Sequence, residues 1–219
     1  MKKYFRELVL WILIFLPYVY LATIWNKLPE RVPTHFNLAG NPDDWSGKTT
    51  LLFLPGALGI GIYLLMLVIP FLDPKRKLQQ MGDKYYTFRF MLTAFFSIFA
   101  TYILYITSTG SMRNPNMFIA LIGILFALLG NYFQTVRPNY FIGIRTPWTL
   151  ENETVWKKTH RLGGRIWMAG GILIALVCFF ISNNTAMAII FGGLLSVMVI
   201  VPMVYSYTEF QKVKKMVHE

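Results

Sequence analysis

Long apolar stretches separated by short polar links dominate the chain. Each has close to the ~20 residues that an α-helix needs to cross the ~30 Å hydrocarbon layer of a membrane. The stretches lack the alternation of polar and apolar residues that is typical of barrel strands. In hydrocarbon the backbone must satisfy its own hydrogen bonds, which leaves the helix. The pattern therefore predicts an all-α, polytopic membrane protein with six transmembrane helices, at about Leu8–Trp25, Leu51–Leu72, Phe90–Thr107, Met117–Val136, Ile166–Ser182 and Ala186–Tyr207.

The basic residues gather on alternate links. The chain has 219 residues and a formal net charge of +11. All but four of its 21 Lys and Arg residues lie at the two ends, in the second link or in the fourth; the exceptions are Lys27, Arg31, Lys48 and Arg113. Because cytoplasmic loops carry the excess of Lys and Arg, both termini are predicted to be cytoplasmic. The charge thus indicates topology and lipid contact, and not nucleic-acid binding.

The links suggest three parts of the chain. We expect an N-terminal two-helix unit at 1–72 with an external loop at 26–50, a third helix with its links at 73–116, and a three-helix unit at 117–219 with a cytoplasmic loop at 137–165. The first segment has no clear small-residue cleavage site, which favours a retained helix over a signal peptide.

Proline and small residues predict features inside the helices. Kinks or local unwinding are expected at Pro17, Pro55, Pro70 and Pro202. Small residues at four-residue spacing let helix backbones approach closely, either within one bundle or between two copies of the chain. Such pairs are Ala57/Gly61, Gly123/Ala127, Gly171/Ala175 and Gly192/Ser196.

The external loop is rich in Pro, Gly and Asn, which argues for a short ordered excursion instead of a helix. Its segment Arg31–Asn37 has enough β-branched and aromatic residues for one short strand or extended stretch. The cytoplasmic loop has an irregular first half, and then Thr149 is expected to cap a helix that ends at Gly163–Gly164.

That helix has a basic face, on which Lys157, Arg161 and Arg165 recur every four residues. A basic amphipathic helix beside a membrane favours contact with anionic lipid or, alternatively, with an acidic protein partner. Arg145 in the irregular half is expected to bind backbone carbonyls or to stack on Trp148.

Catalytic patterns are not found. His35 has Asp43 and Asp44 near it in sequence, and His160 lies among basic residues, but neither has a second His or Cys at ligand spacing. No nucleophile with partners and no phosphate-binding glycine loop is recognisable. The spans as drawn contain no Asp, Glu, Lys, Arg or His, which disfavours a coupled transporter. We therefore predict no enzyme activity, no metal and no cofactor.

Two segments resemble a known family. Residues 137–164, with the sequence RPNYFIGIRTPWTLENETVWKKTHRLGG, resemble the hallmark of the SdpI family of bacterial immunity proteins. Residues 28–48 resemble the small uncharacterised domain that often precedes it. The resemblance implies a multi-pass protein of the bacterial cell membrane. It also implies protection against a secreted peptide toxin and, with toxin bound, recruitment of a cytoplasmic transcriptional repressor to the membrane.

The resemblance assigns tasks to the two loops as hypotheses. Toxin would be bound outside by Pro33, His35, Asn37, Asp43 and Trp45. A partner or lipid would be contacted inside by Asn139, Arg145, Trp148, Trp156, Lys157, His160 and Arg161. The alternatives are a transporter or a membrane enzyme that uses the external loop, with His35 and the two aspartates as its chemistry, or a regulatory membrane anchor without an immunity role.

Overall fold

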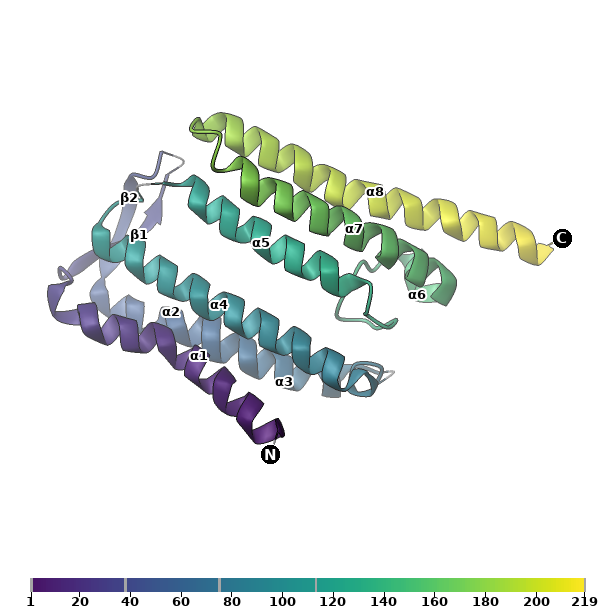
Figure 1. Ribbon diagram of the computed structural model, residues 1–219, viewed down its shortest axis with the longest axis horizontal. Helices are drawn as coiled ribbons and strands as arrows, with labels where there is room; N and C mark the ends of the chain where they lie inside the picture. Colours follow the sequence, from purple (N-terminus) through teal and green to yellow (C-terminus); the bar gives the residue numbers. More distant parts are fainter. Residues whose placement is uncertain (1, 38, 75, 113, 219) are drawn as a thin grey trace. The chain divides into compact units, whose positions relative to one another are not determined.

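The structure, a computed structural model, describes residues 2–37, 39–74, 76–112 and 114–218, and it describes the side chains of these from 4 to 216. Helices make up most of the chain (Figure 1). The longer ones are α1 (Lys2–Ile24), α3 (Ile62–Leu72), α4 (Asp83–Thr109), α5 (Asn116–Phe133), α7 (Glu153–Val177) and α8 (Asn184–His218). The short ones are η1 (Trp25–Lys27), η2 (Lys48–Leu52), α2 (Phe53–Pro55), η3 (Gly56–Gly61), η4 (Gln79–Met81) and α6 (Pro147–Glu151).

Five helical segments are long and apolar enough to cross a membrane: Tyr4–Lys27, Lys48–Leu72, Asp83–Thr109, Asn116–Phe133 and Asn184–Met216. The chain is thus a mainly α-helical protein with several membrane-crossing candidates, as its sequence predicts. The expected span at Ile166–Ser182 falls in α7, whose first half is strongly basic. The apolar part that remains in the helix, Ile166–Val177, is about 18 Å long, which is shorter than the hydrocarbon layer. Six spans therefore stay a prediction.

The chain forms two compact units, Met1–Val68 with Tyr86–Pro115 and Ile69–Tyr85 with Asn116–Glu219. The first unit holds α1, most of α4 and the external loop. The second holds α5 to α8 and the cytoplasmic loop. The sequence suggests a separate middle part at 73–116 that contains α4. In the structure most of α4 belongs to the same compact unit as the N-terminal helices.

In the first unit the helix that follows the external loop widens after Pro55. The residues Gly56–Gly61 form a π-helix, η3, between α2 and α3. Local unwinding next to Pro55 is thereby confirmed, since the α-helical hydrogen-bond pattern gives way to a π-helix directly after this residue. Pro17, Pro70 and Pro202 instead lie inside the continuous helices α1, α3 and α8.

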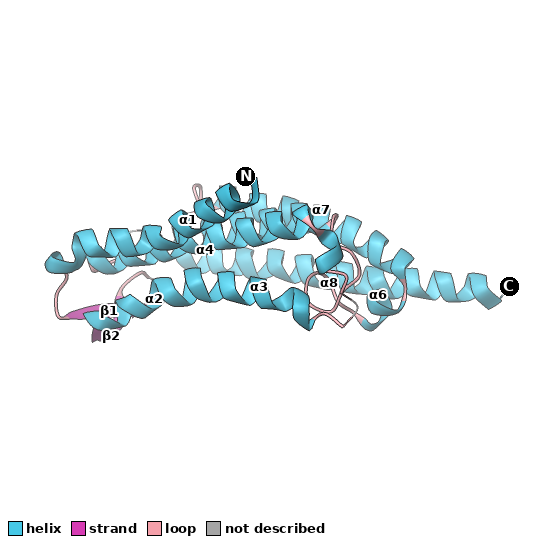
Figure 2. Ribbon diagram, turned by 90° about the horizontal axis from the view of Figure 1, so that it is seen from below, coloured by secondary structure: helices cyan, strands magenta, loops and turns pink. Residues whose placement is uncertain are grey.

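The external loop is a β-hairpin, drawn in magenta in Figure 2. Its strands β1 (Arg31–Phe36) and β2 (Pro42–Gly47) pair antiparallel. The sequence predicts β1 but not β2, whose Pro, Asp and Gly residues are unfavourable in strands. Cross-strand hydrogen bonds override these preferences, so the all-α class holds for the membrane helices and not for this loop.

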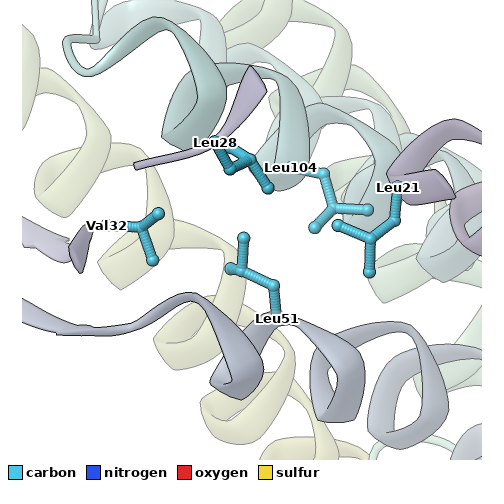
Figure 3. Packing of buried hydrophobic residues seen from close by; sticks show 5 residues of the cluster. All are labelled: Leu21, Leu28, Val32, Leu51 and Leu104. Carbon is cyan, nitrogen blue, oxygen red and sulfur yellow. The ribbon is translucent and has the colours of Figure 1, made fainter. Parts of the chain in front are cut away.

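The hairpin is fixed to its unit by a small hydrophobic cluster (Figure 3). Val32 on β1 is fully buried and packs with leucines from the neighbouring helices. The cluster consists of Leu21, Leu28, Val32, Leu51 and Leu104. Because α1, both ends of the loop and α4 each contribute to it, the hairpin is held as part of the first unit.

In the second unit α5, α7 and α8 lie side by side (Figure 1). Glycines let α5 and α7 touch through their backbones. A Cβ at Gly123 would lie 2.8 Å from the Gly171 carbonyl, and a Cβ at Gly164 would lie 2.6 Å from the Gly130 carbonyl. The small-residue pairs Gly123/Ala127 and Gly171/Ala175 therefore serve packing inside one bundle, the first of the two expected roles.

The expected helix in the cytoplasmic loop differs from the observed one at both ends. Asn152, and not Thr149, caps α7, since its side chain accepts from the Thr154 and Val155 amides at 2.9 and 3.0 Å. The helix does not end at Gly163–Gly164 but continues to Val177. Both glycines are buried against neighbouring elements, so close packing outweighs their weak helix propensity.

Candidate functional site

The hairpin of the first unit presents a polar outer surface. His35 Nδ1 lies 2.5 Å from Asp43 Oδ1, with the two side chains 68% and 45% exposed. Trp45 is 42% exposed and lies opposite Pro33 in the strand register. The neighbouring Asp44 is used locally, because its carboxylate accepts from the Trp45 amide. The hairpin thus exposes an aromatic ring and an acid–imidazole pair, two features suited to binding a peptide.

The tip of the hairpin is held from two directions. The Asn37 side chain accepts from the amides of Ala39 and Asn41 at 3.0 and 3.1 Å, which closes the turn. Gly40 has φ +81°, and its carbonyl accepts from the Met112 amide beyond α4. A Cβ at Gly40 would lie 2.5 Å from the Met112 carbonyl, so only glycine fits this contact. The tip is therefore seated on the segment that follows α4.

These contacts sort the five residues expected to bind toxin. His35, Asp43 and Trp45 are exposed and lie together on the hairpin. Asn37 is exposed, but its side chain is occupied by the turn. Pro33 is buried, so it supports the hairpin from within. The structure thus brings His35 and Asp43 together and leaves Trp45 exposed two residues along β2 from Asp43, and the binding itself stays a prediction.

In the second unit the irregular part of the cytoplasmic loop is ordered by Asn139, which is 1% exposed. Its amide nitrogen donates to the carbonyls of Arg137 and Ile142, and its oxygen accepts from the amides of Phe141 and Ile142. All four bonds measure 2.7 to 3.0 Å. One buried side chain therefore satisfies the backbone of a tight turn.

His160 on α7 fastens the same loop to the helix. Its Nδ1 donates to the Trp156 carbonyl at 2.9 Å, and its Nε2 accepts from the Ile144 amide at 2.9 Å. Both bonds together require the neutral imidazole with the proton on Nδ1. Burial lowers the pKa of His160 from 6.5 to about 4, because the charged form is poorly solvated there. The ring also stacks on Trp156 with 4.0 Å between centroids.

Gly143 makes the His160 contact possible. It has φ +113°, and a Cβ there would collide with His160 Nε2. The fully buried Trp156 adds a further bond, since its Nε1 donates to the Val136 carbonyl at 2.9 Å. The loop therefore folds around a pair of stacked rings on α7.

Threonines close the far end of the loop. Thr146 caps the short helix α6, and its side chain and that of Thr149 bond to each other's backbone amides. The Thr146 hydroxyl also lies 3.1 Å from the Ser206 hydroxyl on α8. Nearby, the Trp148 ring lies against Tyr207, with 5.0 Å between centroids. Trp148 thus packs on α8, whereas the Arg145 guanidinium binds the Tyr140 carbonyl, the first of its two expected roles.

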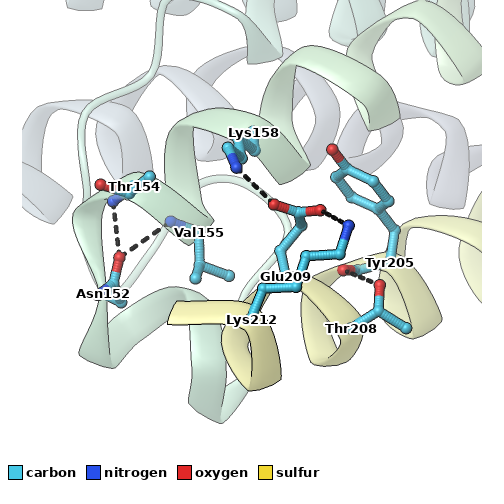
Figure 4. Close-up of polar contacts among 8 residues, drawn as sticks. All are labelled: Asn152, Thr154, Val155, Lys158, Tyr205, Thr208, Glu209 and Lys212. Carbon is cyan, nitrogen blue, oxygen red and sulfur yellow. Dashed lines mark hydrogen bonds and ion pairs between the residues drawn. The ribbon is translucent and has the colours of Figure 1, made fainter. Parts of the chain in front are cut away.

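An ion-pair network fixes α8 to α7 (Figure 4). Glu209, 3% exposed, binds Lys158 at 2.6 Å and Lys212 at 2.7 Å. Glu209 follows the apolar part of α8. Its ion pair with Lys158 therefore joins α8 to the basic half of α7, beyond the apolar parts of both helices. Val155, Trp156 and Thr159 of α7 are fully buried.

Burial separates the seven residues that were expected to contact a partner or lipid. Asn139, Trp156 and His160 are at most 2% exposed and are bound to the loop, so they contact nothing outside in this conformation. Their role here is to shape the loop. Arg145, Lys157 and Arg161 are exposed and Trp148 is half-buried, so these four are placed for outside contact.

Sequence reasoning missed a polar cluster in the first unit. Arg89 on α4 pairs with Glu7 on α1, and the Tyr63 hydroxyl donates to Glu7 at 2.8 Å. The Arg89 guanidinium also lies over the rings of Tyr63 and Tyr86, 5.3 and 5.0 Å from their centroids. Glu7 and Arg89 each directly precede an apolar stretch, so the boundaries drawn from hydropathy left them outside the spans. Their opposite charges at matching span ends were the available signal.

Comparison with known proteins supports the two motifs. Residues 135–206 match the SdpI/YfhL protein family, and residues 12–59 match a domain of unknown function, DUF1648. The chain is 28% identical over 212 residues to the Immunity protein SdpI of Bacillus subtilis, which covers 94% of this chain and 96% of that protein. An uncharacterized protein of Archaeoglobus fulgidus is 35% identical over 57 residues, 26% of this chain and 31% of its own length. No solved structure matches the chain.

The two matched segments contain the two ordered loops. The DUF1648 match takes in both strands of the hairpin, and the SdpI/YfhL match takes in the loop folded around Trp156 and His160. Residues 135–206 are thus an SdpI/YfhL family region and residues 12–59 a DUF1648 region, which confirms the resemblance that their motifs indicated.

Proposed function

We propose that this chain is a membrane-embedded immunity protein that protects its host cell from a secreted peptide toxin. The observation that carries the proposal is the similarity to Immunity protein SdpI along 94% of the chain, which includes both loops and the helices between them. Several helices apolar enough to cross a membrane agree with the cell membrane as its place. The family is one of immunity proteins and not of enzymes, which favours binding over catalysis.

On this proposal the toxin is bound at the hairpin. Trp45 offers a large apolar surface, and the His35–Asp43 pair adds polar partners beside it. Exposed aromatic side chains on a rigid support bind peptides at low entropic cost. The hairpin is such a support, because Val32 and Gly40 fix it to its unit.

The test is survival of a toxin-sensitive strain that expresses the chain and is challenged with the killing peptide of the family. The unaltered chain should protect, and Trp45→Ala should abolish most protection at an unchanged amount of protein in the membrane. The matched control is Thr34→Ala, which changes another exposed residue of the hairpin, on β1, and should protect fully. Killing of cells with the unaltered chain at the vector level would refute immunity against that peptide. Equal protection by Trp45→Ala would refute the hairpin site.

Alanine at His35 and Asp43 separates binding from catalysis. A binding surface that keeps Trp45 should lose only part of its affinity, so protection should fall gradually with toxin dose. A catalytic pair would lose protection completely at every dose. This measurement therefore also decides between the immunity proposal and the enzyme alternative.

We further propose that the cytoplasmic loop binds a transcriptional repressor when toxin is bound. Arg145, Trp148, Lys157 and Arg161 are the side chains placed for it, since the rest of the motif is buried in its own loop. Co-expressed fluorescent repressor should move to the membrane on toxin addition, and Arg145→Ala should prevent this. A repressor that stays in the cytoplasm with the unaltered, protective chain would leave immunity standing and refute the signalling role.

A further inference from the structure

A shallow groove of about 250 Å³ runs along the surface of the second unit between α5 and α7. Its apolar lining residues are Ile124, Ala127 and Leu128 of α5 and Ile172, Ala175 and Leu176 of α7. Asn131 is its polar lining residue, and it is the last groove residue along α5. Because the two helices are antiparallel, the Asn131 end lies toward the basic first half of α7.

Two arginines of α7 continue the line of the groove. At 3.6 residues per turn, Arg161 and Arg165 fall within about 60° of Ile172 and Leu176 on one face of the helix. Arg165 follows Gly164, whose position contacts Gly130 of α5 and Gln134 just after this helix, on either side of Asn131. The apolar groove therefore leads to a pair of guanidinium groups.

The charges of these two arginines are not neutralised within the described part of the chain. Lys157 pairs with Glu153 at 3.1 Å, and Lys158 pairs with Glu209 at 2.6 Å. Arg161 and Arg165 are exposed and have no ion pair with any residue that the structure describes. Among the described cations on the basic half of α7, Arg161 and Arg165 are therefore the ones without an ion pair, and they are also the two that lie in line with the groove.

We propose that the groove and the two arginines form a binding site for an anionic phospholipid. One acyl chain lies along the groove, and the phosphate lies at Arg161 and Arg165. A guanidinium group matches phosphate oxygens by paired hydrogen bonds, which an ammonium group does not. Asn131 stands between chain and phosphate, where a lipid has its polar ester groups. This site is independent of the hairpin and of toxin binding, and it shares only Arg161 with the surface proposed for the repressor.

Lipid is the occupant that the surroundings favour. The groove lies between α5, which is apolar enough to cross a membrane, and the apolar half of α7, so in a membrane it would face hydrocarbon. Its almost wholly apolar lining gives water no partners. The small-residue contacts of α5 and α7 are used between these two helices themselves, which removes the usual feature of a further helix–helix interface. An acyl chain fills the groove without such a feature.

Native mass spectrometry of the purified full-length chain tests the site, with phosphatidylglycerol and phosphatidylcholine as probes. The double variant Arg161→Gln with Arg165→Gln should bind phosphatidylglycerol roughly 30-fold more weakly, from about fivefold for each cation near the phosphate. The matched control is Lys214→Gln with Lys215→Gln, which removes the same charge from the exposed end of α8. It should bind as the unaltered chain does, and phosphatidylcholine should bind weakly to all.

Equal phosphatidylglycerol binding by the arginine and control variants would overturn the proposal, as would equal affinity for the two lipids. The groove is tested separately by a phosphatidylglycerol with a photoreactive acyl chain. Crosslinks at Ile172 or Leu176 are expected, and crosslinks confined to other helices would overturn the chain position. A second copy of the chain is tested with Ile172→Cys in a Cys178→Ser background. Disulfide-linked dimers through this position in the membrane would assign the groove to that copy and overturn the lipid.

Discussion

Gly143 is the residue on which the geometry of the cytoplasmic loop most directly depends. Its φ of +113° disfavours any L side chain, and a Cβ would meet His160 Nε2, the atom that accepts from the loop. Gly143→Ala should therefore destabilise the protein by about 2 kcal/mol or more. Thermal unfolding in detergent should show a clearly lower Tm.

Gly192→Ala is the control for that variant. Gly192 lies in α8, and a Cβ there has nothing within 4 Å. The same glycine-to-alanine change should leave the Tm unchanged or raise it, because alanine is the better helix former. A Gly143→Ala protein as stable as Gly192→Ala would show that the loop relaxes freely around His160.

His160 should make the stability depend on pH. Its pKa is about 4 in the folded protein and 6.5 in the unfolded chain, so the folded state favours the neutral ring. The contribution is fully present above pH 6.5 and is lost as the pH falls toward 4, by about 3 kcal/mol in all. Unfolding should be measured between pH 7 and 4 for the unaltered chain and for His160→Gln. The variant should be less stable at pH 7 and should lose less on acidification; parallel pH curves would contradict this role.

The sequence indicates the residues of this loop but not their roles. A histidine among Lys157, Lys158 and Arg161 looks exposed and basic in one dimension. In the fold it is neutral and buried, because one partner is a carbonyl four residues back and the other an amide 16 residues away. The second partner depends on how the loop returns to α7, which no local pattern contains. The same applies to Arg89 and Glu7, which are 82 residues apart.

At the level of helices, the contact of α5 with α7 depends on glycine at Gly130. A Cβ there would collide with the Met168 amide and lie 2.7 Å from the Gly164 carbonyl. Gly130→Val should push the two helices apart and cost several kcal/mol, since backbone atoms cannot move aside as a flexible side chain can. A large loss of Tm or of folded yield is expected.

Gly193→Val provides the matched comparison for this helix contact. Gly193 is exposed on α8, and nothing lies within 4 Å of its Cβ position. This variant should keep nearly the full Tm. If both variants were equally stable, α5 and α7 would not depend on a backbone contact.

The helices themselves were largely predictable, because long apolar stretches leave the backbone little choice in hydrocarbon. The pattern could not predict the structure of segments in which local residue preferences and long-range packing favour different conformations. Gly163–Gly164 is a common helix end in solution, yet here it permits Ile144, Pro202 and α5 to approach, and the helix continues. β2 contains Pro42, Asp43 and Gly47, and it forms a strand only because β1 pairs with it.

For the whole molecule, α7 decides the topology. With five spans the two ends of the chain lie on opposite sides of the membrane, and with six they lie on the same side. The apolar part of α7 is short, but Arg165 can extend its charge toward the interface and the bilayer can thin, each at modest cost. The alternation of basic links favours six, because five would place either the cytoplasmic-loop cations or the basic end of α8 outside.

Cysteine accessibility checks this topology, since Cys178 is the single cysteine of the chain. In a Cys178→Ser background, Trp45→Cys should react in intact cells with a membrane-impermeant thiol reagent, because the exposed hairpin is predicted to be external. Tyr4→Cys and Met216→Cys, both exposed, should react only after the cells are permeabilised. Labelling of Met216→Cys but not Tyr4→Cys in intact cells would establish an odd number of spans. With an odd number of spans, the basic half of α7 and the end of α8 would lie on opposite sides of the membrane. Lys158 of α7 and Glu209 of α8 form an ion pair here, so that result would require this pair to be broken.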